Sequence, residues 1–172
     1  MNNAFKGCLI FFLVFFSLTV KAQTPLELND KLSSITDSLY ARGQQWGTQF
    51  NDAYKAKDFK LLIPYRQALS AYVDKSIARV KVMKDVKNSK PLRMAMIGFL
   101  EFEKQMITDG FIPVEKLSPS ASDEDMKAAL AKLTALSSKE NGELQKVAAA
   151  QEAYARENGF QIEPAKTEEV GK

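Results

Sequence analysis

The 172-residue chain carries 24 Lys and Arg against 21 Asp and Glu, no His and one Cys. Lys6, Lys21 and Cys8 all fall within residues 1–22, so removal of this segment leaves 22 basic and 21 acidic groups, and the net charge falls from +3 to +1. The remainder then contains neither Cys nor His, which excludes disulfides, thiol catalysis, Cys/His zinc sites, His-ligated haem and every His-based triad. Its length is that of one domain.

Residues 1–22 have the pattern of a secretory signal peptide. Lys6 precedes an uncharged apolar run, residues 7–20, and the small residue Ala22 stands before Gln23. As a helix the run would span about 21 Å, short of the ~30 Å hydrocarbon core of a bilayer, so a permanent anchor is the weaker alternative. Cys8 precedes the run instead of following it, which argues against a lipoprotein. We expect cleavage after Ala22 and export to the periplasm, the cell surface or the medium.

The first helix of the exported part is predicted to start at Thr24-Pro25-Leu26-Glu27. A capping hydroxyl, Pro at the first helical position and Glu at the third form a capping box. The apolar residues that follow have the spacing of a bundle seam, with one position skipped near Arg42. They are Leu28, Leu32, Ile35, Leu39, Trp46, Phe50 and Ala53.

Two further helices are predicted in the middle of the chain. Asp58 is expected to cap the second, whose apolar stripe continues to about Val86. The third is expected to begin near Pro91 and to break at residues 110–113, with a short helical turn at 111–117. The stripes consist of Leu62, Leu69, Val73, Ile77, Val80 and Met83 in the second helix, and Leu92, Met96, Phe99, Phe102 and Met106 in the third.

A fourth helix is predicted between a capping box that starts at Ser122 and a left-handed cap at Gly159, with Phe160 folding back. Because the connections are short and the helices have similar lengths, consecutive helices should be antiparallel neighbours. The predicted fold is all-α: an up-down-up-down antiparallel four-helix bundle over residues 23–160, after the cleaved signal peptide and before a disordered tail, 161–172.

Two stretches, Tyr54-Lys55-Ala56-Lys57-Asp58-Phe59 and Gln151-Glu152-Ala153-Tyr154-Ala155-Arg156-Glu157-Asn158-Gly159-Phe160, resemble a family of small exported bacterial proteins known as leptospiral-type surface proteins. The resemblance implies a four-helix bundle and an exported location, and it carries over no functional residues because the family has no assigned activity. Many members look like lipoproteins, whereas this chain lacks a cysteine at its cleavage site.

A candidate groove is indicated by Gly43-Gln44-Gln45-Trp46-Gly47. Each glycine costs about 1 kcal/mol relative to Ala within a helix, so a local gain should offset it. Gly43 and Gly47 could shape a groove in which Trp46, Tyr40 and Phe50 form an apolar wall for a ligand or a partner helix. Alternatively, the glycines let a neighbouring helix approach closely or let this helix bend.

Seven basic residues form what we call the basic patch, against the nearby acids Asp74 and Asp85. Their local excess of positive charge could attract an anionic envelope component or an acidic envelope protein; the alternative is a solvated helix face. Nucleic acid is not expected, because no aromatic residues are interleaved with these charges. The patch consists of Lys75, Arg79, Lys81, Lys84, Lys87, Lys90 and Arg93.

No catalytic, metal or cofactor motif is present. Gly-x-Ser-x-Gly, Ser-x-x-Lys and phosphate-binding glycine loops are missing, and Asp123-Glu124-Asp125 lacks the spaced ligands of a calcium loop. The favoured hypothesis is an exported, non-enzymatic bundle that acts by binding or structural interaction at the cell envelope. The alternatives are a carrier of a small apolar ligand near Trp46, and a hydrolase that uses two carboxylates.

Overall fold

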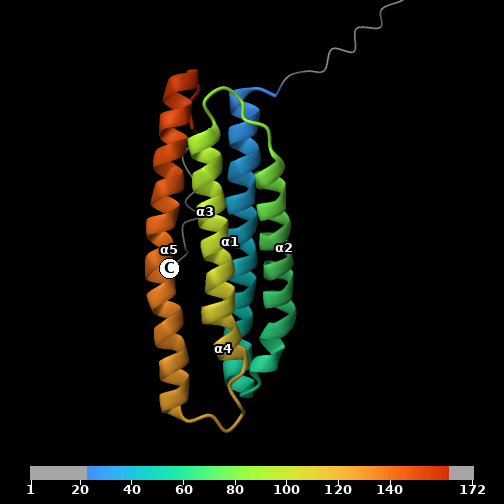
Figure 1. Cartoon of the computed structure of the whole chain (residues 1–172). Coiled ribbons are helices and arrows are strands. Elements are labelled where there is room, and N and C mark those ends of the chain that lie inside the picture. The colour runs from blue at the N-terminus through green and yellow to red at the C-terminus, as the bar shows by residue number, and fades with distance from the viewer. Residues whose placement is uncertain (1–22, 163–172) are drawn as a thin grey trace, which may run out of the picture.

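The computed structural model describes residues 23–162, which form an all-α structure of four long helices lying side by side (Figure 1). The third long helix is built from α3, a π-helical turn η2 and the short helix α4. No strand occurs in this range. The bounds are Pro25–Ala56 for α1, Phe59–Leu62 for the 3₁₀ turn η1, Ile63–Val82 for α2, Lys90–Met106 for α3, Ile107–Phe111 for η2, Ile112–Glu115 for α4 and Asp123–Asn158 for α5.

Helix α1 begins as predicted. The Thr24 hydroxyl accepts from the Glu27 N–H at 3.2 Å, and the Glu27 carboxylate accepts from the Thr24 N–H at 2.9 Å, which completes the capping box. The predicted seam residues are buried except for Phe50, which is partly buried. At the skipped position, the Arg42 guanidinium lies 4.2 Å from the centre of the Tyr72 ring of α2, so a cation–π contact replaces an apolar one.

The second helix begins as predicted but ends earlier. Asp58 caps the 3₁₀ turn η1, which runs directly into α2, and its carboxylate accepts from the Lys60 N–H at 3.1 Å. α2 ends at Val82, four residues before the predicted end at Val86, since the backbone at Met83 is extended. The predicted stripe therefore runs past the end of the helix into the loop that joins α2 to α3.

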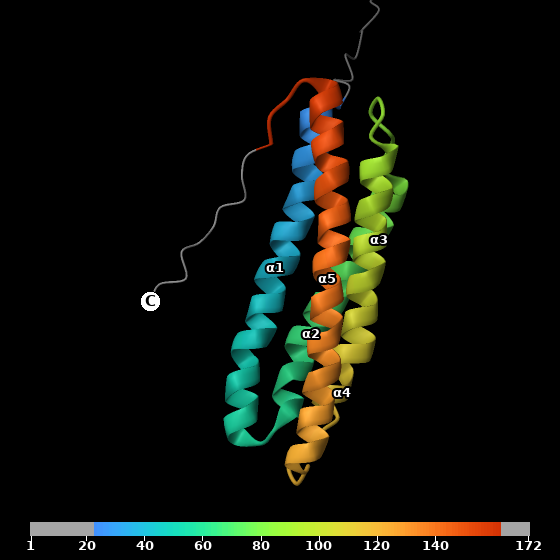
Figure 2. The same ribbon diagram turned by 90° about the vertical axis from the view of Figure 1, so that its left-hand side faces the viewer.

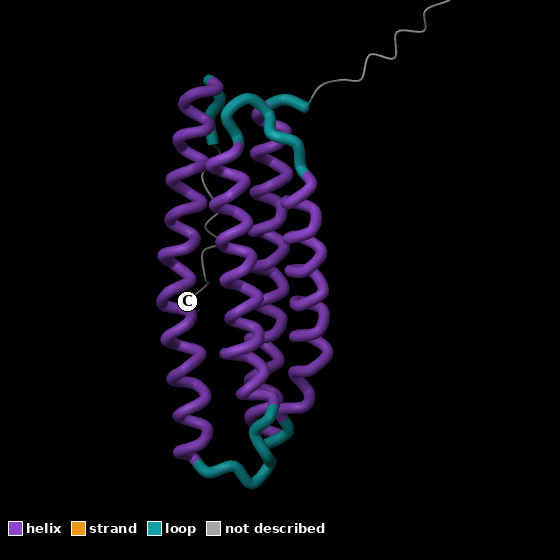
Figure 3. Tube along the Cα trace, viewed as in Figure 1, coloured by secondary structure: helices purple, strands orange, loops and turns teal. Residues whose placement is uncertain are grey.

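The predicted break at residues 110–113 is also wrong. The chain stays helical through the wider π turn η2 and continues into α4 (Figure 3). Pro113 lies at the start of α4, directly after this wider turn. Gly110 permits α5 to approach closely here: a Cβ at this position would lie 2.9 Å from Leu133 Cδ1 and 3.3 Å from Leu136 Cδ1. The glycine marks a close helix contact and not a helix end.

Helix α5 confirms both predicted caps. The Ser122 hydroxyl accepts from the Asp125 N–H at 3.1 Å, and the Asp125 carboxylate accepts from the Ser122 N–H at 3.2 Å. At the other end Gly159 has φ 71°, the left-handed conformation that favours glycine. Phe160 folds back as expected, and its ring meets that of Tyr154 edge-on with 5.7 Å between centroids.

The loops between the helices, and the two ends of the described chain, lie at the ends of the bundle. The α1–α2 turn and the α4–α5 loop lie at one end, and the α2–α3 loop, the start of α1 and the end of α5 lie at the other (Figures 1 and 3). No helix within residues 23–162 is long and apolar enough to cross a membrane. The predicted signal peptide lies outside the described residues, as does the predicted tail apart from Gln161 and Ile162, so both stay predictions.

Candidate functional site

An open cleft of about 680 Å³ lies between α1 and α5. Phe50 and Tyr54 of α1 face Met126 and Leu130 of α5 across it, so its walls are largely apolar and aromatic. Polar side chains from both helices complete the lining. These are Asn51, Asp123, Lys127 and Thr134, together with the small residue Ala131.

The cleft exists because α1 and α5 are joined near only one end. The Gln151 amide of α5 donates to Asn29 Oδ1 at 2.9 Å and to the Ser33 hydroxyl at 3.0 Å, which holds the two helices together beside the start of α1. Toward the other end the two ribbons diverge (Figure 2). Phe50 and Tyr54 lie about six and seven turns beyond Asn29, where the helices have separated.

Stacked aromatic rings connect the cleft to the core. Trp46 stacks on Phe111 with 4.2 Å between ring centroids and on Phe50 at 5.7 Å, and Phe50 in turn stacks on Tyr54 at 6.2 Å. Trp46 itself is only 4% exposed, and its indole N–H is buried without a hydrogen-bond partner. Phe50 therefore stands between the buried indole and the space of the cleft.

The structure brings together some of the predicted groove residues. Phe50 lines the cleft and Trp46 supports it from behind, whereas Tyr40 is 69% exposed and does not line it. Nothing lies within 4 Å of a Cβ built on Gly43 or Gly47, so the alternative that these glycines let a neighbouring helix approach closely is wrong. The opposite wall of the cleft comes from α5. The predicted groove residues all lie on α1, so they did not include this wall.

A second, smaller hollow of about 120 Å³ adjoins the cleft at the end of the bundle. It shares Tyr54, Asp123 and Met126 with the cleft, and it extends over Phe59 and Lys57 toward the α4–α5 loop. The cleft and this hollow thus form one continuous depression, and Lys57 lines the part nearest the end of the bundle.

The basic patch divides into paired and unpaired cations. Lys81 forms an ion pair with Glu101 at 2.9 Å, and the Arg93 guanidinium binds both oxygens of Asp85, at 2.8 and 3.2 Å. The Arg93 guanidinium holds the pKa of the Asp85 carboxyl below its usual range. Within residues 23–162 the other five form no ion pair: Lys75, Arg79, Lys84, Lys87 and Lys90.

A pair of carboxyl groups that the sequence did not reveal lies between α3 and α5. Glu103 is 7% exposed, one of its oxygens is buried without a partner, and the Glu140 carboxyl lies beside it. Burial, and then the neighbouring Glu140 carboxyl, raise the pKa of Glu103 to about 8. A signal was available, because Glu103 continues the predicted apolar stripe of Met96, Phe99 and Met106 at helical spacing.

This carboxyl pair is not part of the cleft. Among the described residues that line the cleft, Asp123 is the only acid. Over the same part of the chain, no group of three or more potential metal-ligating acids, Cys or His comes together. The arrangement of the cleft is thus suited to holding an apolar group, with hydrogen bonds at its edge.

Comparisons of the chain with family models, with curated proteins and with solved structures found no match. The resemblance to leptospiral-type surface proteins therefore stays a prediction.

Proposed function

We propose that the protein is an exported, non-enzymatic four-helix bundle of up-down-up-down antiparallel topology that binds a small apolar molecule in the cleft between α1 and α5. The observation that carries this proposal is the open cleft of about 680 Å³ walled by Phe50, Tyr54, Met126 and Leu130. The cleft is widely open to solvent, so it would bury one face of a bound molecule against these four side chains. The topology is supported by connections that alternate between the ends of the bundle (Figure 1).

The chemistry of the lining favours binding over hydrolysis. Two-carboxylate hydrolysis needs both acids beside the substrate, with a separation of about 5–10 Å. The described lining offers Asp123 alone, and Glu103 and Glu140 lie elsewhere, between α3 and α5. The cleft instead supplies apolar surface for a ligand body and Asn51, Lys127 and Thr134 for polar contacts. Export rests on the signal-peptide pattern of residues 1–22.

The test is a titration with N-phenyl-1-naphthylamine, an uncharged apolar dye whose emission rises on transfer from water. We expect saturable binding, accompanied by quenching of Trp46, because this indole is the chain's single tryptophan and stacks on the cleft residue Phe50. Ala131→Phe should fill the cleft and weaken dye binding about tenfold or more. Ala128→Phe is the matched control, since Ala128 is an exposed residue of α5 that does not line the cleft.

Two outcomes would reject the proposal. One is the absence of saturable binding to the unmodified protein. The other is an equal loss of binding in the Ala131→Phe and Ala128→Phe variants, with both proteins showing the same helical circular dichroism as the parent.

A further inference from the structure

The loop that joins α2 to α3 lies at one end of the bundle. We call this loop, together with the adjoining turns of the two helices (residues 79–94), the tip. It exposes large apolar side chains beside its cations. Val82, the last residue of α2, is 80% exposed, and Met94, one turn after Lys90 on α3, is 51% exposed. Val82 lies on the same stripe of α2 as Lys75 and Arg79, at spacings of four and three residues. Val82 therefore shares one face of α2 with two cations.

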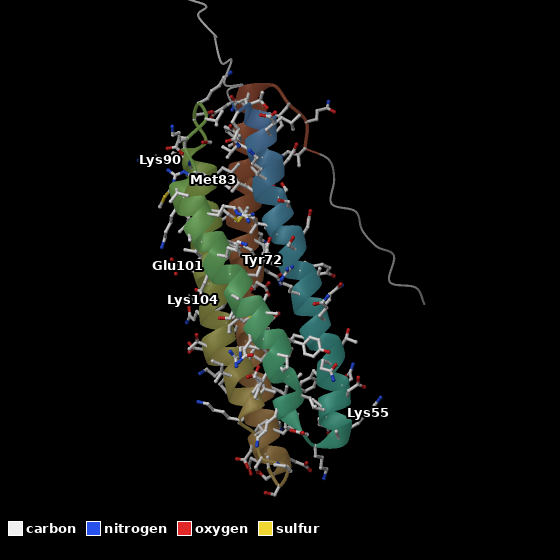
Figure 4. The ribbon with its side chains drawn as sticks, turned by 90° about the vertical axis from the view of Figure 1, so that its right-hand side faces the viewer. Lys55, Tyr72, Met83, Lys90, Glu101 and Lys104 are labelled. Carbon is white, nitrogen blue, oxygen red and sulfur yellow. The ribbon has the colours of Figure 1, made fainter. Side chains whose placement is uncertain are left out.

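The tip keeps a strong positive charge when the cations that form ion pairs are left out of the count. It contains six basic residues, of which Lys81 is paired with Glu101 and Arg93 with Asp85. Arg79, Lys84, Lys87 and Lys90 are exposed and form no ion pair within the described chain, which leaves an excess of four positive charges. Figure 4 shows Lys90 projecting from this end of the bundle, beside Met83.

The backbone of the loop is fixed to the bundle, so its lysines are presented by a preorganised scaffold. The Tyr154 hydroxyl of α5 donates to the Val86 carbonyl at 3.1 Å, and the Asn158 amide of α5 donates to Asn88 Oδ1 at 2.9 Å. Ser89 is fully buried and accepts from the Val86 N–H at 2.9 Å. With one side held inward by these bonds, the charged side chains of the loop face solvent.

We propose that the tip docks onto the surface of an anionic lipid bilayer. Each lysine or arginine near such a surface strengthens binding about fivefold at moderate salt. The four unpaired cations of the tip therefore favour binding to it. A soluble polyanion would use these charges equally well but would leave Val82 and Met94 in water. A bilayer supplies both components: anionic headgroups for the cations and an apolar boundary region for the two exposed side chains. The cleft lies toward the opposite end of the bundle, so this inference does not depend on the proposed ligand.

The experiment measures retention of residues 23–172 on sedimented vesicles. This chain contains the whole described bundle and omits the apolar run of residues 7–20, which would bind lipid by itself. Vesicles of equal parts phosphatidylglycerol and phosphatidylcholine should retain the protein, whereas pure phosphatidylcholine should not. Retention should fall as salt rises, because exposed charges are screened.

Two sets of variants separate the tip from net charge. Lys84→Glu, Lys87→Glu and Lys90→Glu together should lower retention by a hundredfold or more. The control combines Lys55→Glu, Lys57→Glu and Lys60→Glu, three exposed lysines at the opposite end of the bundle (Figure 4 labels Lys55). The two sets change the net charge equally, and each includes one lysine with φ 52°, Lys87 or Lys57. The control should lose less than tenfold.

A third variant tests the apolar component. Val82→Ser combined with Met94→Ser should reduce retention on anionic vesicles about tenfold and leave binding to soluble dextran sulfate unchanged. The bilayer proposal is overturned if anionic vesicles do not retain the protein or if the control triple variant loses as much as the tip variant. It is equally overturned if the serine variant is retained in full, because the tip would then be a site for a soluble polyanion.

Discussion

Helix α5 packs closely against α3 and η2 on one side, whereas on the other it is hydrogen-bonded to α1 near one end and separated from it by the cleft near the other. The close side contains Gly110, which leaves room for Leu133 and Leu136. At the corresponding level α1 presents the aromatic rings of Phe50 and Tyr54. Both sides carry apolar residues at helical spacing, so this spacing alone does not distinguish a close helix contact from an open one.

The largest expected effect concerns the buried carboxyl on the close side. The Glu103 pKa is raised from 4.5 to about 8, so between these pH values the folded protein keeps a proton that the unfolded chain has lost. The free energy of unfolding should therefore fall as pH rises from 4.5 to 8, by on the order of 4 kcal/mol. Glu103→Gln should remove this dependence and be the more stable protein at pH 8, as measured by urea unfolding.

Glu101→Gln serves as the control, because Glu101 lies on the same helix but is exposed and paired with Lys81. Its unfolding should retain the pH dependence of the parent. A parent stability that stays level or increases over this pH range would contradict the assigned state of Glu103.

A smaller effect is expected from the glycines. Gly110→Ala should gain less stability than Gly47→Ala, because its Cβ would displace the side-chain ends of Leu133 and Leu136 and this cost offsets the gain in helix propensity. Gly47→Ala on α1 meets no neighbour and should stabilise by about 1 kcal/mol through helix propensity. Thermal or urea unfolding compares the two. If both substitutions stabilise the protein equally, the close packing of α5 at η2 is not as described.

An effect of similar size should come from the contact that joins α5 to α1. Gln151→Ala removes the hydrogen bonds to Asn29 and Ser33 and should cost about 1–2 kcal/mol, partly because Asn29 is buried. Hydrogen exchange should quicken in the first turns of α1. Gln145→Ala, at an exposed position of α5 for which no hydrogen bond is found, should change neither quantity. Equal behaviour of the two variants would argue that the Gln151 contact does not hold the helices together.

The features that are predicted best from the sequence are those that depend only on residues close together along the chain. The capping boxes at Thr24 and Ser122 and the glycine cap at Gly159 are all confirmed, because each needs only side chains within one turn of the backbone. The all-α class follows from apolar spacing in the same way. The end of α2 was predicted too late because its last apolar residues pack from a loop.

Contacts and clefts between helices could not be predicted, because they depend on the relative height and tilt of the helices. Glu103 and Glu140 are 37 positions apart, and their meeting depends on how far α5 extends beside α3. The cleft likewise needs the divergence of α1 from α5, to which no single residue gives a signal (Figure 2). Phe50 was part of the predicted groove beside Trp46, whereas Met126 and Leu130 lie on α5 and were not part of it.

The length of α1 sets a distance between the two proposed binding surfaces. α1 begins at the end of the bundle that bears the tip, and Phe50 and Tyr54 follow 25 and 29 residues after Pro25. At 1.5 Å per residue the cleft therefore lies about 40 Å from that end. With its helix axes along the bilayer normal, a protein docked by its tip would hold the cleft beyond the headgroup layer, in the aqueous phase. It would exchange its ligand with a soluble donor or a facing membrane, and not with the bilayer on which it rests.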